Sequence, residues 1–389
     1  MFKNIANAFR IPEIRKRLIF TMLMILLVRF GCQVATPGIN IEYIKAVLDS
    51  LNTTSFNFFN VITGNSFATM SVFALNISPY ITSSIVVQLL TIAIPRLEEL
   101  SKEGEEGKKT INKITRYLTV ALAVIQSVSM AIGFGSSYLN DYTWYNVAVV
   151  TIVMTAGTTA LMWIGERISE KGVGNGISIL LLVNILSGLP GDFGTLYNTF
   201  VKGKSVTIAI LSAILILALI LGLVIFTVYL QDGERRVPVQ YAKKVQGRKM
   251  VGGQSSNIPI KVNTAGVVPI IFASAILYLP AQLAVFFPNV RWMQSFANAI
   301  SSGWLNWILS VVLIVFFAYF YTSMVFNPEE TADQLRKSGG FSPGVRPGKA
   351  TAEYIQNVLN HITLPGAIFM AIIAVVPSIV FAFTNNSLI

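Results

Sequence analysis

Side chains that could do chemistry are few in this sequence, and they do not gather into a motif. His361 is the single histidine and Cys32 the single cysteine, so no histidine pair and no internal disulfide can form. Metal-assisted hydrolysis needs several His, Cys or carboxylate ligands, and the sequence has neither an HExxH motif nor a carboxylate pair within an apolar run. We therefore predict no catalytic residue, no metal and no cofactor, and the chain is not expected to be an enzyme.

Arg29 is the one ionisable side chain that lies deep within an apolar run. A charge at membrane depth is costly and usually marks a functional site. A small-solute secondary transporter would place several such groups, or a substrate site, near the middle of broken helices, and these are nearly absent. That transporter is the alternative function, and a membrane-embedded enzyme, which would need catalytic clusters, is a third. We interpret His361, near a helix end, as an interfacial residue.

The elements that hold these residues are strongly apolar. Hydrophobic residues make up 53% of the chain and charged residues 12%, against about 25% charged in soluble domains. Helices are predicted because a chain in lipid must satisfy its own backbone hydrogen bonds, and barrel-like alternation is absent. Nine apolar runs suited to a hydrocarbon core about 30 Å thick lie at approximately 18–35, 77–94, 114–134, 145–165, 176–189, 206–230, 264–287, 304–326 and 362–383. The predicted fold is an all-α polytopic membrane protein.

The net charge of +11 could indicate a nucleic-acid binder, but the positions of the basic residues indicate membrane topology instead. They concentrate in the N-terminal tail and in alternate loops, while the loops on the other side hold only Lys45, Lys202, Lys204 and Arg291. By the positive-inside rule the N-terminus and the basic loops are cytoplasmic. Residues 1–17 are either an amphipathic helix on the inner surface or a solvated tail.

Three segments outside the nine runs are candidates for function. A half-polar stretch after the first run is too weak to span, so it is either a re-entrant element or an external loop. Two long basic segments, 231–262 and 327–352, are rich in Gly and Pro and are expected to project as defined loops. They either form a docking surface or only set the orientation of the chain.

Several residue strings resemble the SecY family, the channel subunit of the bacterial Sec translocase, and the similarity covers nearly the whole chain. One string begins at Ile94 and reads IPRLEELSKEGEEG. Another begins at Arg235 with RRVPVQYAK and continues through GGQS to KVNTAGVVP, which begins at Lys261. Two more are NPEETAD from Asn327 and GVRPG from Gly344. Strings this long and numerous are highly specific.

The resemblance implies a channel of two pseudo-symmetric halves, residues 1–190 with helices one to five and residues 191–389 with helices six to nine. Unfolded secretory proteins would cross the bacterial plasma membrane through its pore, and membrane segments would leave through a lateral gate. The N-terminus would be cytoplasmic. The implied partners are SecE and SecG, the motor ATPase SecA, the ribosome, preproteins with their signal sequences, and membrane lipid.

The same resemblance implies roles for particular residues. The half-polar stretch, about 58–72, would be the plug, represented by Asn60, Gly64 and Phe67. An apolar pore ring, which can dewet and exclude ions yet yield to a passing chain, would consist of Ile77, Ile81, Leu181, Ile185, Val268 and Ile271. Polar contacts of the lateral gate would be Thr82, Gln88 and Asn263. Contacts to SecA or a ribosome would be Arg235, Arg236, Lys243 and Arg346, with Arg346 the strongest candidate.

The sequence departs from the family pattern at its end. The family has a tenth helix and a basic cytoplasmic tail, whereas this sequence stops at Ile389 shortly after the ninth run. Nine spans from a cytoplasmic N-terminus leave the C-terminus outside. The expectation is therefore a truncated or divergent form with the tenth helix missing, whose pore ring lacks one contributor.

Overall fold

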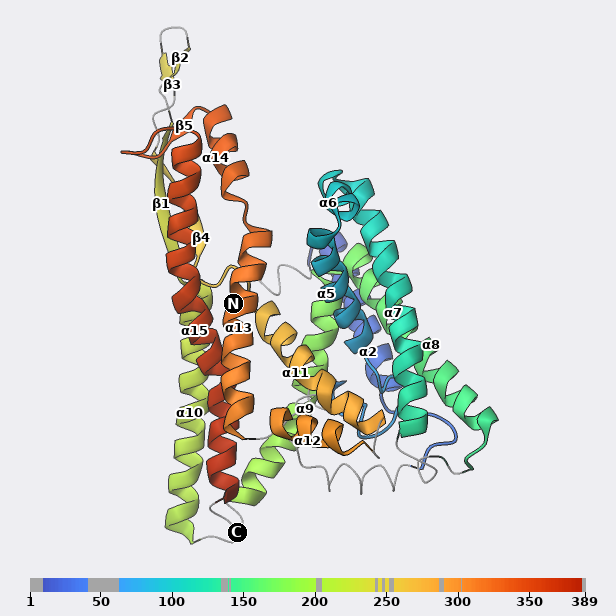
Figure 1. Ribbon diagram of the computed structural model, residues 1–389. Helices are drawn as coiled ribbons and strands as arrows, with labels where there is room; N and C mark the ends of the chain where they lie inside the picture. Colours follow the sequence, from blue (N-terminus) through green and yellow to red (C-terminus); the bar gives the residue numbers. More distant parts are fainter. Residues whose placement is uncertain are drawn as a thin grey trace. The chain divides into compact units, whose positions relative to one another are not determined.

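The computed structural model describes residues 10–40, 63–133, 139, 141–200, 205–241, 244–246, 249–251, 255–286, 290–301 and 303–386. The chain divides into two compact units. Unit 1 consists of Met1–Thr199 and Pro280–Ser301, and unit 2 consists of Phe200–Leu279 and Ser302–Ile389. Most described residues are helical, as predicted, and strands occur in unit 2 (Figure 1). The predicted halves, 1–190 and 191–389, remain a prediction.

Unit 1 is a set of helices around a buried apolar cluster. Its helices are α2 (Pro12–Gly31), α5 (Ser78–Ala93), α6 (Pro95–Lys102), α7 (Glu105–Gly133), α8 (Trp144–Lys171), α9 (Gly176–Phe200) and α12 (Arg291–Ser301). Helix α7 packs against both α5 and α8, and α2 packs against α8. The cluster joins side chains of α2, α8 and α9 to Phe73 and Ile77, which lie between α2 and α5. Residues 63–77, called the central segment below, therefore belong to the core of unit 1.

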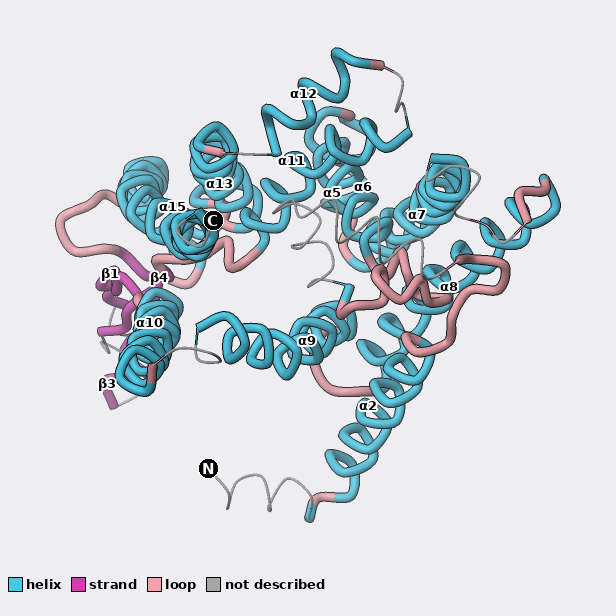
Figure 2. The backbone as a smooth tube through the Cα atoms, turned by 90° about the horizontal axis from the view of Figure 1, so that it is seen from below, coloured by secondary structure: helices cyan, strands magenta, loops and turns pink. Residues whose placement is uncertain are grey.

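Unit 2 contains long helices that pack side by side. They are α10 (Val206–Asp232), the first part of α11 (Val268–Phe286), α13 (Trp304–Val325), α14 (Pro328–Lys337) and α15 (Lys349–Asn386). Helix α15 packs along α13 and touches α10 (Figure 2). Phe272 of α11 meets Phe317 of α13 edge to face, with ring centroids 5.4 Å apart. Such pairs add to the apolar burial that holds spanning helices together.

A three-stranded sheet completes unit 2. Strand β1 (Glu234–Tyr241) pairs antiparallel with β4 (Ser255–Lys261) on one side and with β5 (Gly340–Phe341) on the other. A smaller hairpin is formed by β2 (Lys244–Gln246) and β3 (Lys249–Val251). Val237 and Val239 of β1 are buried while their neighbours are exposed, as expected of a half-buried strand. They pack with side chains of β4, α14 and the first turns of α15.

We call these packed elements and the turn that joins β5 to α15, residues 234–241, 255–261 and 328–359, the sheet platform. The sequence predicts that segments 231–262 and 327–352 project as defined loops. The structure instead gives them strands and a helix, and it joins them through the pairing of Gln240 with Phe341. The two segments share one apolar core, so they form a single folded body.

Five described helical stretches are long and apolar enough to cross a membrane: Glu105–Ile132, Trp144–Lys171, Ala209–Asp232, Trp304–Lys337 and Lys349–Ile379. The pair Ser78–Ala93 and Pro95–Ser101 is bent by 106°, because Pro95 holds Ile94 in an extended conformation. The predicted runs at 176–189 and 264–287 contain shorter apolar helices, Gly176–Gly191 and Val268–Leu277. The run at 18–35 falls mostly in α2. The count of nine spans remains a prediction.

Helix α14 begins with a strong N-cap, which makes a testable contribution to the platform. The Asn327 side chain accepts hydrogen bonds from the backbone N–H groups of Glu329 and Glu330, at 3.1 and 3.4 Å. We expect Asn327→Ala to destabilise the first turn by about 1 kcal/mol. Limited proteolysis should then cut α14 several times faster, whereas Gln334→Ala, on the exposed face of the same helix, should leave the cleavage rate unchanged. Equal rates for both variants would contradict the capping role.

Candidate functional site

Four predicted pore-ring residues lie in unit 1, on α5 and α9. Ile77 precedes α5 and is buried in the core, while Ile81 in the first turn of α5 is half-buried. On α9, Leu181 is half-buried and Ile185, one turn later, is 41% exposed. Ile77 and Ile81 both contact the apolar cluster of unit 1. Their role as a ring remains a prediction.

In unit 2 the predicted ring residues Val268 and Ile271 are half-buried in the first turn of α11. The predicted gate residue Asn263 lies just before this helix and is buried. Its Nδ2 donates to Oε1 of Gln231 at 3.2 Å and lies 3.4 Å from Sδ of Met370. Asn263 therefore links the ends of α10 and α11 to α15 within unit 2. The contact with Gln231 is not evident from the sequence.

The other predicted gate residues lie on α5 in unit 1. The Thr82 hydroxyl donates to the backbone carbonyl of Ser78 at 3.1 Å. Gln88 Nε2 donates to Oγ of Ser84 at 3.5 Å, a long and weak bond. The buried Oε1 of Gln88 has no hydrogen-bond partner among the described residues. Gln88 thus keeps an acceptor available for another donor, and the gate role of Thr82, Gln88 and Asn263 remains a prediction.

The central segment contains two of the predicted plug residues. Gly64 has a φ of +61°, which favours glycine, and Phe67 is buried. Two backbone hydrogen bonds of 2.9 Å, from Thr36 to Met70 and from Val72 to Val34, tie the segment to the chain that follows α2. Asn60 and residues 58–62 of the predicted plug lie outside the described residues.

Sequence reasoning singles out Arg29 but not its partners. Arg29 on α2 donates to Asn184 on α9, and Asn184 donates to Asn76 at the end of the central segment. Asn184 stands alone within an apolar run of α9, which is the sequence signal that could have marked it. Nothing in the sequence pairs residues this far apart along the chain. The three side chains form a polar network inside unit 1.

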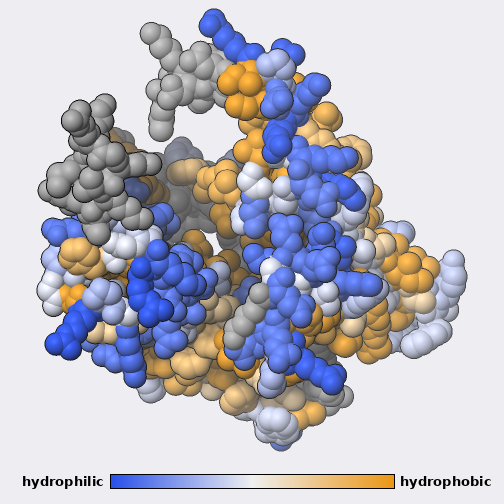
Figure 3. All heavy atoms as spheres, turned by 90° about the horizontal axis from the view of Figure 1, so that it is seen from above, coloured by the Kyte–Doolittle hydropathy of each residue, from blue (hydrophilic) through white to orange (hydrophobic). Residues whose placement is uncertain are grey.

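The sheet platform carries the predicted basic contact residues. Arg235 and Arg236 are exposed on β1, and Arg236 is paired with Glu234 at 2.7 Å. Arg346 is exposed on the turn between β5 and α15. Ser342 Oγ donates to the carbonyl of Pro238 at 3.2 Å and so ties this turn to β1. Lys243 lies outside the described residues. The surface over the platform is largely hydrophilic (Figure 3).

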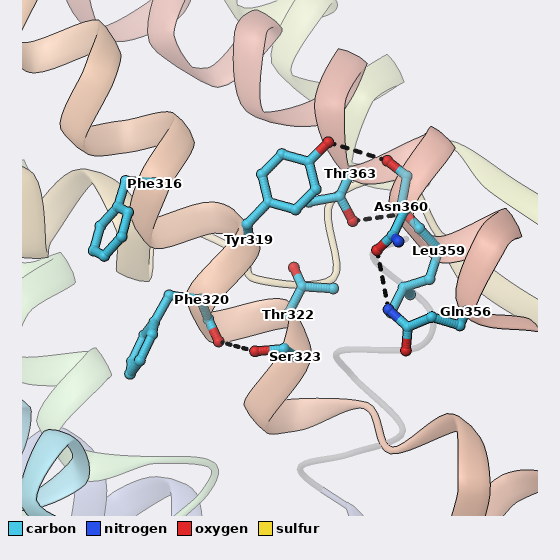
Figure 4. A pocket seen from close by; sticks show the side chains of 9 residues that line it. All are labelled: Phe316, Tyr319, Phe320, Thr322, Ser323, Gln356, Leu359, Asn360 and Thr363. Atoms are coloured by element: carbon cyan, nitrogen blue, oxygen red, sulfur yellow. Dashed lines mark hydrogen bonds between the residues drawn. The ribbon is translucent and has the colours of Figure 1, made fainter. Parts of the chain in front are cut away.

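A groove of about 420 Å³ lies between α13 and α15 in unit 2 (Figure 4). The Tyr319 hydroxyl donates to the Asn360 carbonyl at 3.2 Å, and Gln356 Nε2 donates to Asn360 Oδ1 at 3.0 Å. The side chains that line the groove include no carboxylate, thiol or imidazole, so it suits helix packing rather than acid–base chemistry. Among the described residues no cluster of three His, Cys, Asp or Glu could hold a metal.

Comparison with known sequences gives a consistent result over nearly the full chain. The SecY family model matches residues 71–389. Protein translocase subunit SecY of Pseudomonas aeruginosa is 43% identical over 374 residues, covering 94% of this chain and 84% of the relative. The protein of the same name from Streptomyces coelicolor is 40% identical over 415 residues, covering 98% of this chain and 90% of the relative.

Comparison with solved structures supports the same fold. "The structure of a protein conducting channel" matches with a TM-score of 0.64 at 16% identity and covers 95% of this chain and 89% of that one. "Sec61 in the Canine ribosome-channel complex from the endoplasmic reticulum" matches with a TM-score of 0.59 at 15% identity, covering 94% and 88%. The predicted fold class, a SecY-type helical membrane channel, is confirmed. The chain belongs to the SecY family.

Proposed function

We propose that this protein is the pore subunit of a bacterial Sec translocase and conducts unfolded secretory proteins across the plasma membrane. The observation that carries the proposal is the 43% identity to a protein translocase subunit SecY over 94% of this chain. The fold shared with protein-conducting channels supports it. A small-solute transporter is not favoured, because the predicted spans hold no group of ionisable residues around Arg29.

The pore would be closed by two devices. An apolar ring including Ile81 and Leu181 would exclude ions, because a narrow apolar constriction dewets. The central segment would act as the plug beneath this ring; it is packed into unit 1 and leads into α5, which carries Ile81. In a related channel of known structure, the plug domain is described as one that stabilises the closed state and maintains a membrane seal. We propose the same role here for residues 63–72, the described part of the predicted plug.

A lateral gate would let membrane segments leave the pore. Gln88 keeps a buried acceptor without a partner among the described residues, and Asn263 donates to Gln231 at 3.2 Å. Hydrogen bonds made by these gate residues would favour the closed gate, and an entering signal helix would replace them. Such a bond contributes only about 0.6–2 kcal/mol within a membrane, so it can be exchanged readily.

The sheet platform would receive the partner that drives transport. Projecting basic side chains such as Arg346 suit an acidic surface on SecA or a ribosome, and one structural relative is described as part of a ribosome-channel complex. The platform and the N-terminus would then face the cytoplasm, in agreement with the positive-inside rule. SecE and SecG are proposed as membrane partners on the family resemblance.

Photo-cross-linking tests the proposed pore. A photo-reactive residue replaces Ile81 or Leu181 in turn, and a preprotein is stalled in inverted vesicles with SecA and ATP. We expect preprotein adducts from both positions, since a chain in the pore must pass the constriction. Ile152, 67% exposed on α8, which carries no predicted ring residue, is the matched control and should give no preprotein adduct.

The possible outcomes test the pore ring and the channel function separately. Adducts from Ile81 and Leu181 alone support the pore path and the ring. Equal labelling from all three positions would mean that the preprotein does not pass specifically through the proposed ring. A complex that folds, binds SecE and yields no adduct at any position would contradict the channel function itself.

A further inference from the structure

The charged side chain of Arg29 lies in an apolar helix and has a polar partner on another helix. Conduction through a pore does not by itself require such a pair. Arg29 lies near the end of α2, in a helix whose neighbouring residues are mostly apolar. A guanidinium there is stable only when polar groups accept hydrogen bonds from its N–H groups. Nη1 of Arg29 lies 3.4 Å from Oδ1 of Asn184, a side chain of α9 that is only 1% exposed. The charge is therefore directed into unit 1.

The network continues from Asn184 to the end of the central segment. Nδ2 of Asn184 donates to Oδ1 of Asn76 at 3.2 Å, and the same oxygen accepts the backbone N–H of Ile77 at 2.8 Å. Ile77 immediately precedes α5. A chain of three hydrogen bonds thus runs from α2 through α9 to the point where the central segment becomes α5.

The beginning of the central segment lies beside the same two residues. A Cβ placed on Gly64 would lie 2.9 Å from Nη1 of Arg29 and 2.9 Å from the backbone oxygen of Asn184. Gly64, Asn65 and Asn76 all have positive φ, a conformation that residues other than glycine seldom adopt. Both ends of the segment are therefore held in uncommon conformations next to one polar network, which surrounding contacts must maintain.

We propose that Arg29, Asn184 and Asn76 form a polar latch that holds residues 63–72 in the closed position and breaks when the channel opens. This inference rests on the proposed function of these residues as a plug. The latch suits reversible release because its bonds are long and one donor, Nδ2 of Asn76, is buried without a partner among the described residues. Water entering an open pore would satisfy the polar groups that the latch leaves, which lowers the cost of breaking the network.

Cys32 provides a built-in reporter for the latch. It is the only cysteine in the chain, it is 3% exposed, and it packs in the same cluster as Phe73 of the central segment. A cationic methanethiosulfonate reagent reacts only with a thiol that water reaches. Departure of the segment uncovers Cys32, so the labelling rate measures opening directly.

The experiment compares variants in the assembled complex in membrane vesicles, with Cys32 labelling, idle ion conductance and preprotein translocation as the three readouts. Arg29→Met should raise the labelling rate and the idle conductance about tenfold, as expected for loss of a hydrogen bond to a charged group. Asn184→Asp should also raise the labelling rate, because a carboxylate has no N–H to donate to Oδ1 of Asn76 and so cuts the link between Arg29 and the central segment. In the wild type, a stalled preprotein should accelerate labelling.

Arg17→Met is the matched control, since Arg17 is an exposed arginine on the same helix; it should leave all three readouts unchanged. The latch is refuted when Arg29→Met and Asn184→Asp both translocate preprotein with a wild-type Cys32 labelling rate. Asn184→Asp keeps the test decisive should Arg29→Met fail to assemble. A wild-type complex that translocates nothing contradicts the proposed function instead, so the two failures are distinguishable.

Discussion

Replacing Arg346 by Glu is expected to reduce SecA-driven translocation by at least about tenfold, because an exposed interface arginine is often a hot spot and the new charge repels an acidic partner. The side chain is exposed, but its backbone is fixed: Thr351 Oγ1 donates to the Arg346 carbonyl at 2.8 Å. The variant should therefore fold normally. Translocation of a preprotein into inverted vesicles and the Kd of SecA for the same vesicles measure the effect.

Lys349→Glu supplies the control for charge alone. Lys349 is also exposed and begins α15, three residues after Arg346, so the variant changes the net charge equally. We expect only a modest, salt-dependent decrease in the SecA association rate. An equal loss of translocation in the two variants would show that the general field of the platform, not the position of Arg346, determines docking.

Gly157→Val should destabilise unit 1 and open the resting channel to ions. Gly157 is buried on α8, and a Cβ at this position would collide with the backbone oxygen of Val72 in the central segment. The helix cannot accept the added methyl groups without moving that segment, and overpacking of this kind costs about 1–3 kcal/mol. Thermal unfolding of the purified complex and ion conductance across vesicles without preprotein should both report the change.

Ala156→Val is the matched comparison for Gly157→Val. The preceding residue on α8 is exposed, so its extra methyl groups meet no backbone within the unit. Its unfolding temperature and conductance should stay near the wild-type values. A Gly157→Val variant that behaves like Ala156→Val would mean that α8 and the central segment are not in close contact in the membrane.

The long membrane helices are well predicted from the sequence because composition alone specifies them. The runs in α8, α10 and α13 lack acidic and basic residues over most of their length, and nothing but a helix satisfies such a backbone in lipid. The beginning of α15 is not predicted. Ala352, Ile355 and Leu359 repeat at helical spacing and are buried, but Ala352 lies in a segment whose charge and Gly–Pro content are typical of a loop.

The three-stranded sheet cannot be predicted from composition or from local periodicity. Val237 and Val239 alternate with polar residues, yet the pattern is short and includes Pro238, which weakens any strand prediction. Its partner β4 also contains a proline, Pro259. The pairing of β1 with β5 joins Gln240 to Phe341, a contact between distant parts of the chain that local periodicity does not encode.

Some residues of the candidate site can be predicted from the sequence, and others cannot. Phe67 and Gly64 can be assigned to the central segment from the sequence, and the structure places both within unit 1. The partners of Arg29 cannot be assigned, because Asn184 follows it by 155 residues and the pairing depends on the packing of α2, α9 and the central segment together. A buried polar network is fixed by tertiary structure, and the sequence shows only that its members are unusual in their surroundings.

The order of the strands along the chain sets the time at which the docking surface matures. Strands β1 and β4 are synthesised before α13, but β5 and the first turns of α15 follow only after all of α13 has been made. The buried faces of Val237 and Ile260 acquire Leu335, Ile355 and Leu359 at that late stage. Because elements synthesised first must wait for their partners, the proposed docking surface is complete only when most of the chain has been made.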